Sequence, residues 1–126
     1  MTVPHVAAYR RALSRLEEGL REPESALIRD ACIQRFEFCF ELAWKSIQQL
    51  LREQGQQCSS PKGCLRQAFK QGWIEDEDGW IAILADRNLT LHTYDEALAK
   101  AVYDRLQGYL PMFKGLLQRC EADLAP

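Results

Sequence analysis

Side chains able to do acid–base and phosphate chemistry cluster in the stretch RNLTLHTYDE, residues 87–96. Arg87 carries a permanent charge, and its planar guanidinium can hold two phosphate oxygens at once. Histidine titrates closer to neutral pH than other side chains, so His92 can move protons. Asn88 adds an amide and Tyr94 adds a phenol. This combination suits phosphodiester chemistry, in which one group helps a 2′-hydroxyl attack the adjacent phosphate while Arg87 stabilises the charged transition state.

The spacing of Arg87 and His92 requires a break in the helix between them. Each residue of an α-helix turns by roughly 100°, so on one continuous helix the two side chains would diverge by about 140°. Thr93 and Glu96 have the spacing of a capping box, which predicts a new helix just after Thr93. Arg87 would then end one helix and His92 would precede the next, with Tyr94 in its first turn. The alternative without catalysis is a helix-end ion pair followed by a cap.

The elements that must position this motif have helical periodicity along nearly the whole chain. Apolar residues recur every three or four positions across residues 4–21 and 24–54. A shorter helix should begin after Ser60, because serine is a preferred N-cap and Pro61 fits the first helical position. Gly72 should end it.

Two further helices flank the motif. The acidic run EDED, residues 75–78, fits a solvated loop better than a metal site, and a short helix carrying Trp80 should follow it and end near Arg87. The last helix should start near Tyr94, and Pro111 should kink or break it because proline lacks a backbone N–H and its ring clashes with the preceding turn. Since no segment alternates as a strand would, we predict an all-α, up-and-down helical bundle.

The composition fits one domain covering residues 1–126. Apolar residues make up 47% and charged residues 27% of the chain. No apolar stretch of about 18 residues could cross a membrane, and the N-terminus does not resemble a secretory signal, so we expect a cytoplasmic protein. The net charge of −2 is not that of a protein that coats nucleic acid. RNA would therefore need a local cationic cleft, which two chains could share.

The cysteines show no Cys-x-x-Cys spacing and the chain has only two histidines, so we expect neither a zinc site nor any cofactor. We expect reduced thiols, several of them serving as small hydrophobic residues. The cysteines are Cys32, Cys39, Cys58, Cys64 and Cys120.

Other residues could serve either structure or function. Glu41 and Lys45 lie four apart on the second helix, where they form an ordinary surface pair or, alternatively, line a cleft and meet Arg87. The tryptophans fit the core better than a platform for stacking bases. They are Trp44, Trp73 and Trp80.

The motif and the segments around it resemble one protein family. RNLTLHTYDE is similar to the signature of the nucleotidyltransferase substrate-binding protein family, in the HEPN (higher eukaryotes and prokaryotes nucleotide-binding) superfamily. IQRFEFCFELAWK at residues 33–45, SPKGCLRQAFKQGWI at residues 60–74 and the later YLP fit the same pattern in the same order. Leu91 stands where a small polar residue would be expected, but it leaves the key positions intact.

The resemblance implies a helical bundle, a homodimer and a small MNT-type nucleotidyltransferase encoded nearby. In the related HepT toxins the pattern is Arg, four residues, His, one residue and Tyr, which the chain matches from Arg87 to Tyr94. By resemblance, Arg87 and His92 would be the catalytic pair of a metal-independent ribonuclease, with Asn88 in support. Tyr94 would be the hydroxyl to which the partner enzyme attaches AMP.

Three functions therefore stay open. The chain could be a ribonuclease toxin that its partner silences in a toxin–antitoxin pair, because AMP on Tyr94 would add a phosphate charge and a bulky base beside the catalytic pair. It could instead be a non-catalytic substrate-binding subunit working in trans with the nucleotidyltransferase. The third function is that of a structural helical dimer.

Overall fold

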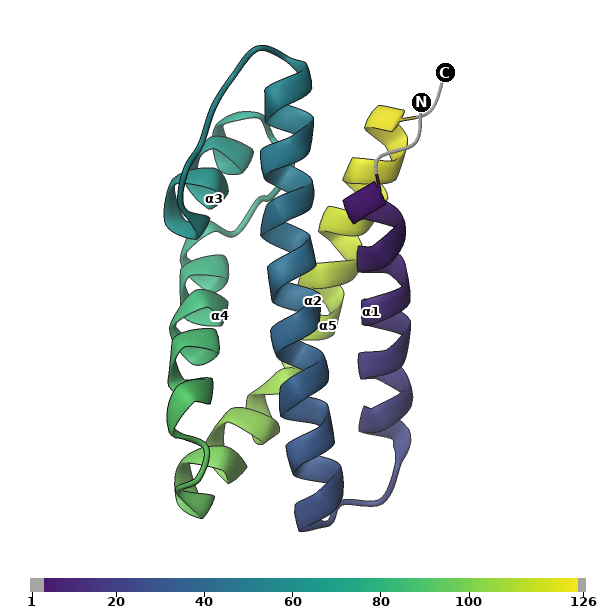
Figure 1. Cartoon of the computed structure of the whole chain (residues 1–126), viewed down its shortest axis with the longest axis vertical. Coiled ribbons are helices and arrows are strands. Elements are labelled where there is room, and N and C mark those ends of the chain that lie inside the picture. Colours follow the sequence, from purple (N-terminus) through teal and green to yellow (C-terminus); the bar gives the residue numbers. More distant parts are fainter. Residues whose placement is uncertain (1–3, 125–126) are drawn as a thin grey trace.

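The computed structural model describes residues 4–124, which contain five α-helices, one short 3₁₀ helix and no strand (Figure 1). The prediction of an all-α helical bundle is therefore confirmed. The elements are α1 (Pro4–Arg21), α2 (Ala26–Glu53), α3 (Pro61–Lys70), α4 (Glu77–Leu89), the 3₁₀ helix η1 (Thr90–His92) and α5 (Glu96–Leu124).

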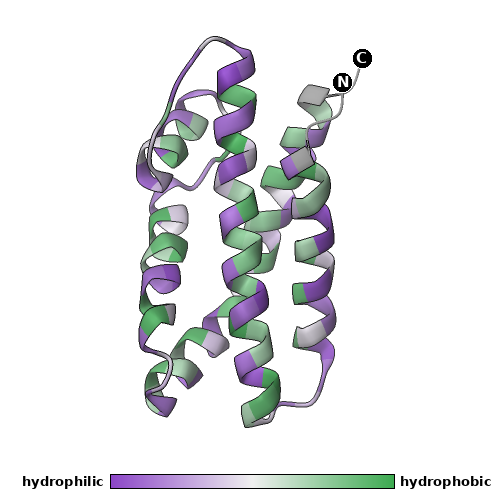
Figure 2. Ribbon diagram, in the orientation of Figure 1, coloured by the Kyte–Doolittle hydropathy of each residue, from purple (hydrophilic) through white to green (hydrophobic). Residues whose placement is uncertain are grey.

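The long helix α2 is the centre of the bundle and contacts α1, α3, α4 and α5. The chain runs down α1, up α2, down through α3 and α4, and up α5 (Figure 1). Green and purple segments alternate along the helices, as expected when one side of each helix is apolar (Figure 2). The turn between α4 and α5, which carries the motif, therefore lies at the same end of the bundle as the start of α2.

Aromatic side chains from four helices fill the core. Tyr9, Phe36 and Phe113 are fully buried, and Trp80 is 2% exposed. The ring of Phe113 meets the rings of Tyr9, Phe36 and Trp80 edge to face, with centroids 6.4, 6.2 and 5.3 Å away. The Tyr9 hydroxyl donates to the Phe113 carbonyl at 2.5 Å, so its polar atom is also satisfied. This cluster holds α1, α2, α4 and α5 together.

The ends of α3 follow the predicted signals. The Ser60 hydroxyl accepts a hydrogen bond from the backbone N–H of Gly63 at 3.1 Å, and Pro61 occupies the first helical position. Gly72 follows the helix with a φ of +78°, a conformation that glycine adopts without the steric cost of a Cβ atom. These local signals needed no tertiary information.

The acidic run at residues 75–78 caps α4 instead of lying wholly in a loop. The Asp76 carboxylate accepts from the backbone N–H of Gly79 at 2.9 Å. Glu77 and Asp78 lie in the first turn, where their charge complements the helix dipole. Across residues 4–124, no group of three or more His, Cys, Asp or Glu side chains is placed to hold a metal ion.

The sequence predicted a kink or a break at Pro111, and α5 continues through Pro111 without a break. Figure 1 shows that its course changes direction part of the way along, as a proline inside a helix would produce. Pro111 and Gln107 are both exposed, so the proline lies on the solvent side of α5 and not in the core.

A disulfide joins Cys58 and Cys64, whose Cα atoms are 5.2 Å apart. The prediction of reduced thiols is therefore wrong for these two, because the loop between α2 and α3 brings together residues whose spacing has no recognised motif. Cys32, Cys39 and Cys120 are buried, as expected for cysteines that act as small hydrophobic residues. Burial raises the pKa of the Cys39 thiol.

Candidate functional site

The motif occupies the turn between α4 and α5, and two threonines shape that turn. The backbone N–H and the hydroxyl of Thr90 both donate to the carbonyl of Arg87, the hydroxyl at 2.6 Å. The Thr93 hydroxyl donates to the Thr90 carbonyl at 3.0 Å, and the Asp95 N–H donates to the His92 carbonyl at 3.1 Å. A continuous series of hydrogen bonds thus runs from the end of α4 to the start of α5.

The cap of α5 is Asp95, so the capping box predicted from Thr93 and Glu96 is wrong. The Asp95 carboxylate accepts from the N–H groups of Ala97 and Leu98, at 3.0 and 3.2 Å. The Thr93 hydroxyl is already engaged with the preceding turn. A carboxylate also interacts more favourably than a hydroxyl with the positive end of the helix. Tyr94 consequently precedes α5 instead of lying in its first turn.

His92 and Tyr94 stand side by side at the surface. Their rings meet edge to face, with centroids 6.1 Å apart, and Tyr94 is 83% exposed. Two hollows adjoin Tyr94. One, of about 570 Å³, lies along α2 between Leu27 and Glu37, and the other, of about 170 Å³, includes Arg29. The break in the helix thus brings the imidazole and the phenol together.

Arg87 turns away from them, toward the interior. Its guanidinium carbon lies 5.3 Å from the ring centroid of Phe40 on α2, a cation–π arrangement. Its Nε atom is buried and has no hydrogen-bond partner in the described part of the chain. Among residues 4–124, no hydrogen bond or ring contact joins Arg87 to His92. Asn88 is exposed one position further along.

Asp86 is a feature of this region that sequence reasoning missed. Its side chain is 6% exposed, and both oxygens accept from Arg105, at 2.8 Å from Nε and 2.7 Å from Nη2. The Tyr109 hydroxyl donates to the same carboxylate at 2.5 Å. Burial and this hydrogen bond raise the pKa of Tyr109 to about 12, and the bond to Asp86 raises the pKa of Arg105. The four-residue spacing of Arg105 and Tyr109, which places both on one face of α5, was the available signal.

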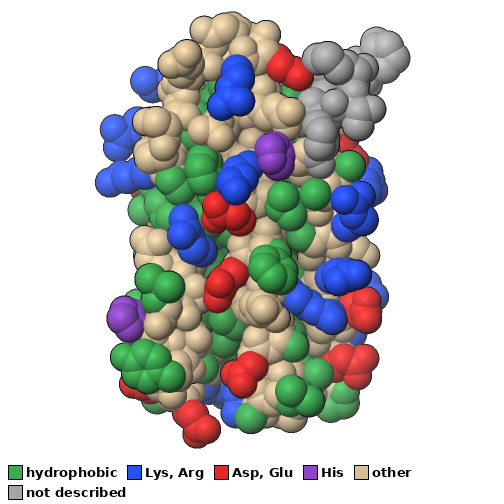
Figure 3. Space-filling view, in the orientation of Figure 1, with side chains coloured by type: hydrophobic (Ala, Val, Ile, Leu, Met, Phe, Trp, Pro, Cys, Tyr) green, Lys and Arg blue, Asp and Glu red, His purple; other side chains and the backbone are tan. Residues whose placement is uncertain are grey.

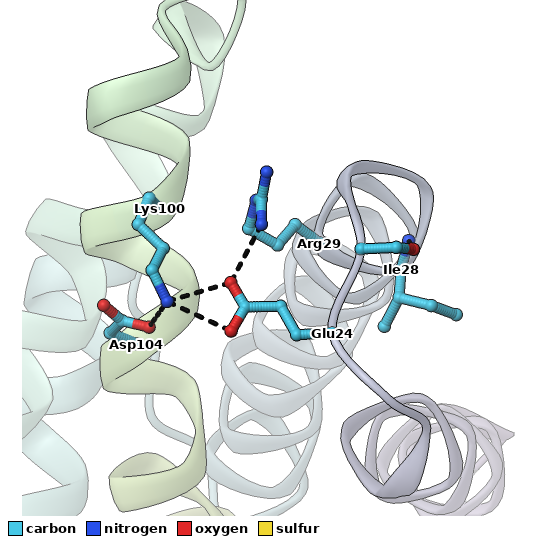
Figure 4. A network of polar contacts seen from close by, with 6 residues as sticks. Glu24, Ile28, Arg29, Lys100 and Asp104 are labelled. Carbon is cyan, nitrogen blue, oxygen red and sulfur yellow. Dashed lines mark hydrogen bonds and ion pairs between the residues drawn. The ribbon is translucent and has the colours of Figure 1, made fainter.

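A second polar network lies where α2 and α5 begin (Figure 4). Its Arg29 also lines the smaller hollow. Glu24 pairs with Arg29 at 2.9 Å and with Lys100 at 2.8 Å, and Lys100 also pairs with Asp104 at 2.8 Å. The hydrogen bond from Lys100, followed by that from Arg29, lowers the pKa of Glu24. The network joins the connection before α2 to α5, but its exposure means that solvent screens it.

The other residues that the sequence left open between structure and function are the Glu41–Lys45 pair and the three tryptophans. Glu41 and Lys45 form the expected ion pair on one face of α2, at 3.6 Å, and both side chains are partly exposed. Trp73 and Trp80 are buried in the core, whereas Trp44 is half-buried. Figure 3 shows acidic and basic side chains interspersed on one face of the molecule. Within residues 4–124, no helix has the length and apolar character needed to cross a membrane.

Known proteins resemble this chain in both sequence and fold. Residues 5–122 match the family described as nucleotidyltransferase substrate binding protein like. A Haemophilus influenzae protein named probable ribonuclease HepT is 35% identical over 92 residues. That match covers 69% of this chain but 63% of the relative, so the chain spans less than two thirds of the relative's length.

Two solved structures share the fold. A Thermus thermophilus protein is 40% identical, with a TM-score of 0.83 over 89% of this chain and 98% of its own. A Haemophilus influenzae protein, described as revealing the fold of a substrate binding domain of a nucleotidyltransferase, is 27% identical, with a TM-score of 0.81 over 92% of this chain and 98% of its own. This chain therefore belongs to the family of nucleotidyltransferase substrate-binding-like proteins.

Proposed function

We propose that this chain is the HEPN-type subunit of a two-component nucleotidyltransferase toxin–antitoxin pair in the cytoplasm. In this proposal it is a metal-independent ribonuclease that AMP transfer to Tyr94 silences. The observation that carries the proposal is the exposed pair of His92 and Tyr94, with ring centroids 6.1 Å apart. A proton-transfer group and a modifiable hydroxyl this close are coupled, because a nucleotide attached to one obstructs the other. The relative named as a probable ribonuclease also supports it.

The proposed cleavage uses groups that the motif provides. His92 takes the proton from a ribose 2′-hydroxyl, whose oxygen attacks the adjacent phosphorus while the bond to the 5′-oxygen breaks. The products are a 2′,3′-cyclic phosphate and a 5′-hydroxyl. Arg87 stabilises the charge that develops on the phosphate, and its Nε–H, which has no partner in the described chain, is an available donor.

A homodimer would complete this site. The leaving 5′-oxygen needs a proton, and one chain offers a single histidine in the motif. The His92 of a second copy could act as the acid if the two motifs faced one cleft. Two such motifs would also bring two Arg87 side chains together, which would give a chain of net charge −2 the local cationic surface that RNA requires.

The proposed silencing step forms one bond and breaks another. The Tyr94 phenol oxygen attacks the α-phosphorus of ATP held by the MNT-type nucleotidyltransferase, and pyrophosphate leaves. The product carries a phosphate charge and an adenosine next to His92. The exposure of Tyr94 supports its access to a second enzyme, and the hollows beside it offer space for the added group.

The alternative is a non-catalytic substrate-binding subunit that works in trans with the nucleotidyltransferase. Two observations favour it. The Arg87 guanidinium lies on Phe40, and within residues 4–124 it makes no hydrogen bond to His92; the Haemophilus structure at 27% identity is described as a substrate binding domain. In this case the partner would use the chain to hold its substrate, and the chain alone would not cleave RNA.

RNA cleavage by the purified chain separates these functions. The wild type should cut RNA in the presence of EDTA and leave cyclic phosphate ends, and His92→Ala should reduce the rate by about a hundredfold or more. His5→Ala is the matched control, since His5 lies on α1 and contacts Gln49. Failure of the wild type to cut RNA, or equal cleavage by His92→Ala, would contradict the ribonuclease function.

Incubation with the partner nucleotidyltransferase and ATP tests the silencing step. Intact-mass and peptide mass spectrometry should find AMP on Tyr94, and RNA cleavage should fall as the modification accumulates. Tyr94→Phe should remain unmodified and active, whereas Tyr103→Phe, which alters a half-buried tyrosine on α5, should be modified normally. Label on a residue other than Tyr94 would contradict the assignment.

A further inference from the structure

Two consecutive residues attach the last turn of α4 to two different helices. Neighbouring residues on a helix point about 100° apart. Asp86 therefore faces α5, where it binds Arg105 and Tyr109, while Arg87 faces α2, where its guanidinium lies on Phe40. Anchors in two directions limit both the rotation of α4 about its axis and its sliding along its neighbours.

The phenol that completes the first anchor is itself held by α2. The ring of Tyr109 stacks on that of Phe36, with centroids 6.1 Å apart and an interplanar angle of 26°. Phe36 lies one helical turn before Phe40, the residue under Arg87. One face of α2 thus supports both anchors, and the end of α4 is fixed relative to α2 and α5 together.

The first anchor is connected to the motif without interruption. Asp86 and Arg87 share the last turn of α4, and the Arg87 carbonyl accepts twice from Thr90. The Thr93 hydroxyl then donates to the Thr90 carbonyl, and the Asp95 N–H donates to the His92 carbonyl just before the Asp95 cap. We call residues 87–95 the motif turn. Leu89 packs against the core and Thr90 is buried, whereas residues 91–95 are exposed or half-buried and are held by these hydrogen bonds.

A buried ion pair contributes little net stability to the packing of two helices, so its main effect can be to fix their relative orientation. Removing the Asp86 carboxylate from water carries a desolvation penalty that Arg105 and Tyr109 only offset, and an apolar cluster of similar volume could provide comparable stability. The two-pronged bond between guanidinium and carboxylate adds directionality that apolar contacts lack. A buried, fully hydrogen-bonded carboxylate next to Arg87 therefore suits a positioning role.

We infer that Asp86, held by Arg105 and Tyr109, is a positioning residue that sets the geometry of the motif turn. It touches neither RNA nor nucleotide, and acts through the end of α4. For RNA cleavage the inference rests on the proposed function, but the effect on the motif turn does not.

Amide hydrogen exchange tests the inference without requiring any enzymatic activity. Asp86→Asn keeps the side-chain shape but removes the charge, so exchange in the motif turn should accelerate by about tenfold or more. The contact between the His92 and Tyr94 rings should also weaken in NMR spectra. Leu13→Ala, which removes a buried side chain on α1, is the control for general loss of stability, and it should leave the relative protection of the motif turn unchanged.

An apolar replacement separates positioning from stability. The variant that combines Asp86→Leu, Arg105→Met and Tyr109→Phe should fold with a thermal midpoint close to that of the wild type, since apolar contacts replace the ion pair. Its motif turn should nevertheless exchange faster than that of the wild type. If the chain cuts RNA, kcat should fall by about tenfold to a hundredfold while KM stays nearly constant, because Asp86 does not contact the substrate.

The outcomes distinguish the two proposals. A stable apolar variant with wild-type protection of the motif turn would overturn the positioning role, whatever the activity. Faster exchange in a protein whose wild type cuts no RNA would support the positioning role and contradict the ribonuclease function. Two single variants can be used if both of these variants fail to fold. Arg105→Lys removes the paired hydrogen bonds between guanidinium and carboxylate, and Tyr109→Phe removes the hydrogen bond from the phenol. Unchanged exchange in both of these single variants would overturn the inference.

Discussion

At the level of single residues, side chains close together in the motif point in different directions because the backbone rotates between them. Arg87 is half-buried against Phe40, whereas His92 is exposed five positions later. For Arg87 to meet a phosphate beside His92, its side chain must leave the aromatic ring. That contact contributes about 0.5 to 2 kcal/mol, which a charge-assisted hydrogen bond to phosphate of about 1.5 to 3 kcal/mol can offset. The position of Arg87 on Phe40 therefore does not conflict with the proposed ribonuclease function.

The hydroxyl of Tyr109 should make stability sensitive to alkaline pH. Its folded-state pKa of about 12 lies above the ordinary value of 10.0, so the protonated phenol stabilises the fold fully below pH 10.0. This contribution is lost as the pH rises through about 12. The wild type should therefore lose more free energy of unfolding over this interval than Tyr109→Phe, which keeps the ring but cannot ionise. Urea unfolding at a series of pH values measures the difference, and parallel curves for the two proteins would contradict it.

At the scale of elements, the turns between helices are built from different local chemistry. The turn after α2 contains a disulfide, the turn before α4 contributes an aspartate cap, and the turn before α5 combines threonine hydroxyls with the Asp95 cap. The aspartate caps and threonine hydroxyls satisfy backbone groups that a helix end leaves unpaired. The disulfide restricts the connecting loop. Among the turns of residues 4–124, the one before α5 has the most side-chain hydrogen bonds to the backbone, and defined geometry there is what the proposed function would need.

Removing the cap of α5 should destabilise the protein by about 1 kcal/mol, because Asp95→Ala leaves two N–H groups at the start of α5 without their acceptor. Glu96→Ala should have a smaller effect, since in the described part of the chain the Glu96 carboxylate caps no N–H group and interacts only with the positive end of the helix dipole. Denaturant unfolding measures both variants. A larger loss from Glu96→Ala than from Asp95→Ala would favour the capping box instead.

Reducing the disulfide between Cys58 and Cys64 should lower the free energy of unfolding by about 2 kcal/mol, since the bond closes only a short loop. Unfolding with and without dithiothreitol measures this effect. The double variant Cys58→Ala, Cys64→Ala provides the control, because the reductant should not change its stability. The three buried cysteines in the described chain should react with a thiol reagent only after unfolding.

At the scale of the whole molecule, α2 organises the bundle through opposite faces. Phe36 is fully buried and contacts Phe113 and Tyr109, whereas Phe38 is 56% exposed. Leu27 and Leu91 are also exposed, at 77% and 79%. The inward face of α2 thus unites the helices into one core. Leu27 on α2 borders the larger hollow beside Tyr94, and Leu91 lies within the motif turn itself, so both leave apolar side chains exposed at this end of the bundle. A second copy of the chain is the partner that the proposed function assigns to this end of the bundle.

Phe36 and Phe38 lie on opposite faces of α2, so alanine substitutions at the two positions test which face packs into the core. Phe36→Ala should cost about 3 to 5 kcal/mol, because it removes a fully buried ring from the aromatic cluster. Phe38→Ala should change the stability of the monomer by about 0.5 kcal/mol or less, since its ring is largely exposed. Thermal and denaturant unfolding at low protein concentration provide the comparison. Equal losses at the two positions would contradict the assigned faces of α2.

Features that depend on local geometry could be predicted from the order of residues. A helical period of 3.6 residues allowed the apolar spacing in residues 4–21 and 24–54 to predict two long helices, and Ser60 with Pro61 predicted the start of α3. The family signature likewise depends on residue order alone. Such features follow from contacts between residues a few positions apart, so they can be identified before the chain is folded.

Contacts between side chains far apart in the sequence became known only from the folded chain. The disulfide between Cys58 and Cys64 depends on how a loop returns, and Asp86 finds Arg105 through the packing of α4 on α5. The same packing turns Arg87 toward α2 and away from His92, although their spacing suggested a shared site. The physical reason is that direction around a helix is known from sequence only relative to that helix. Which neighbour lies in that direction depends on burial of the whole apolar core.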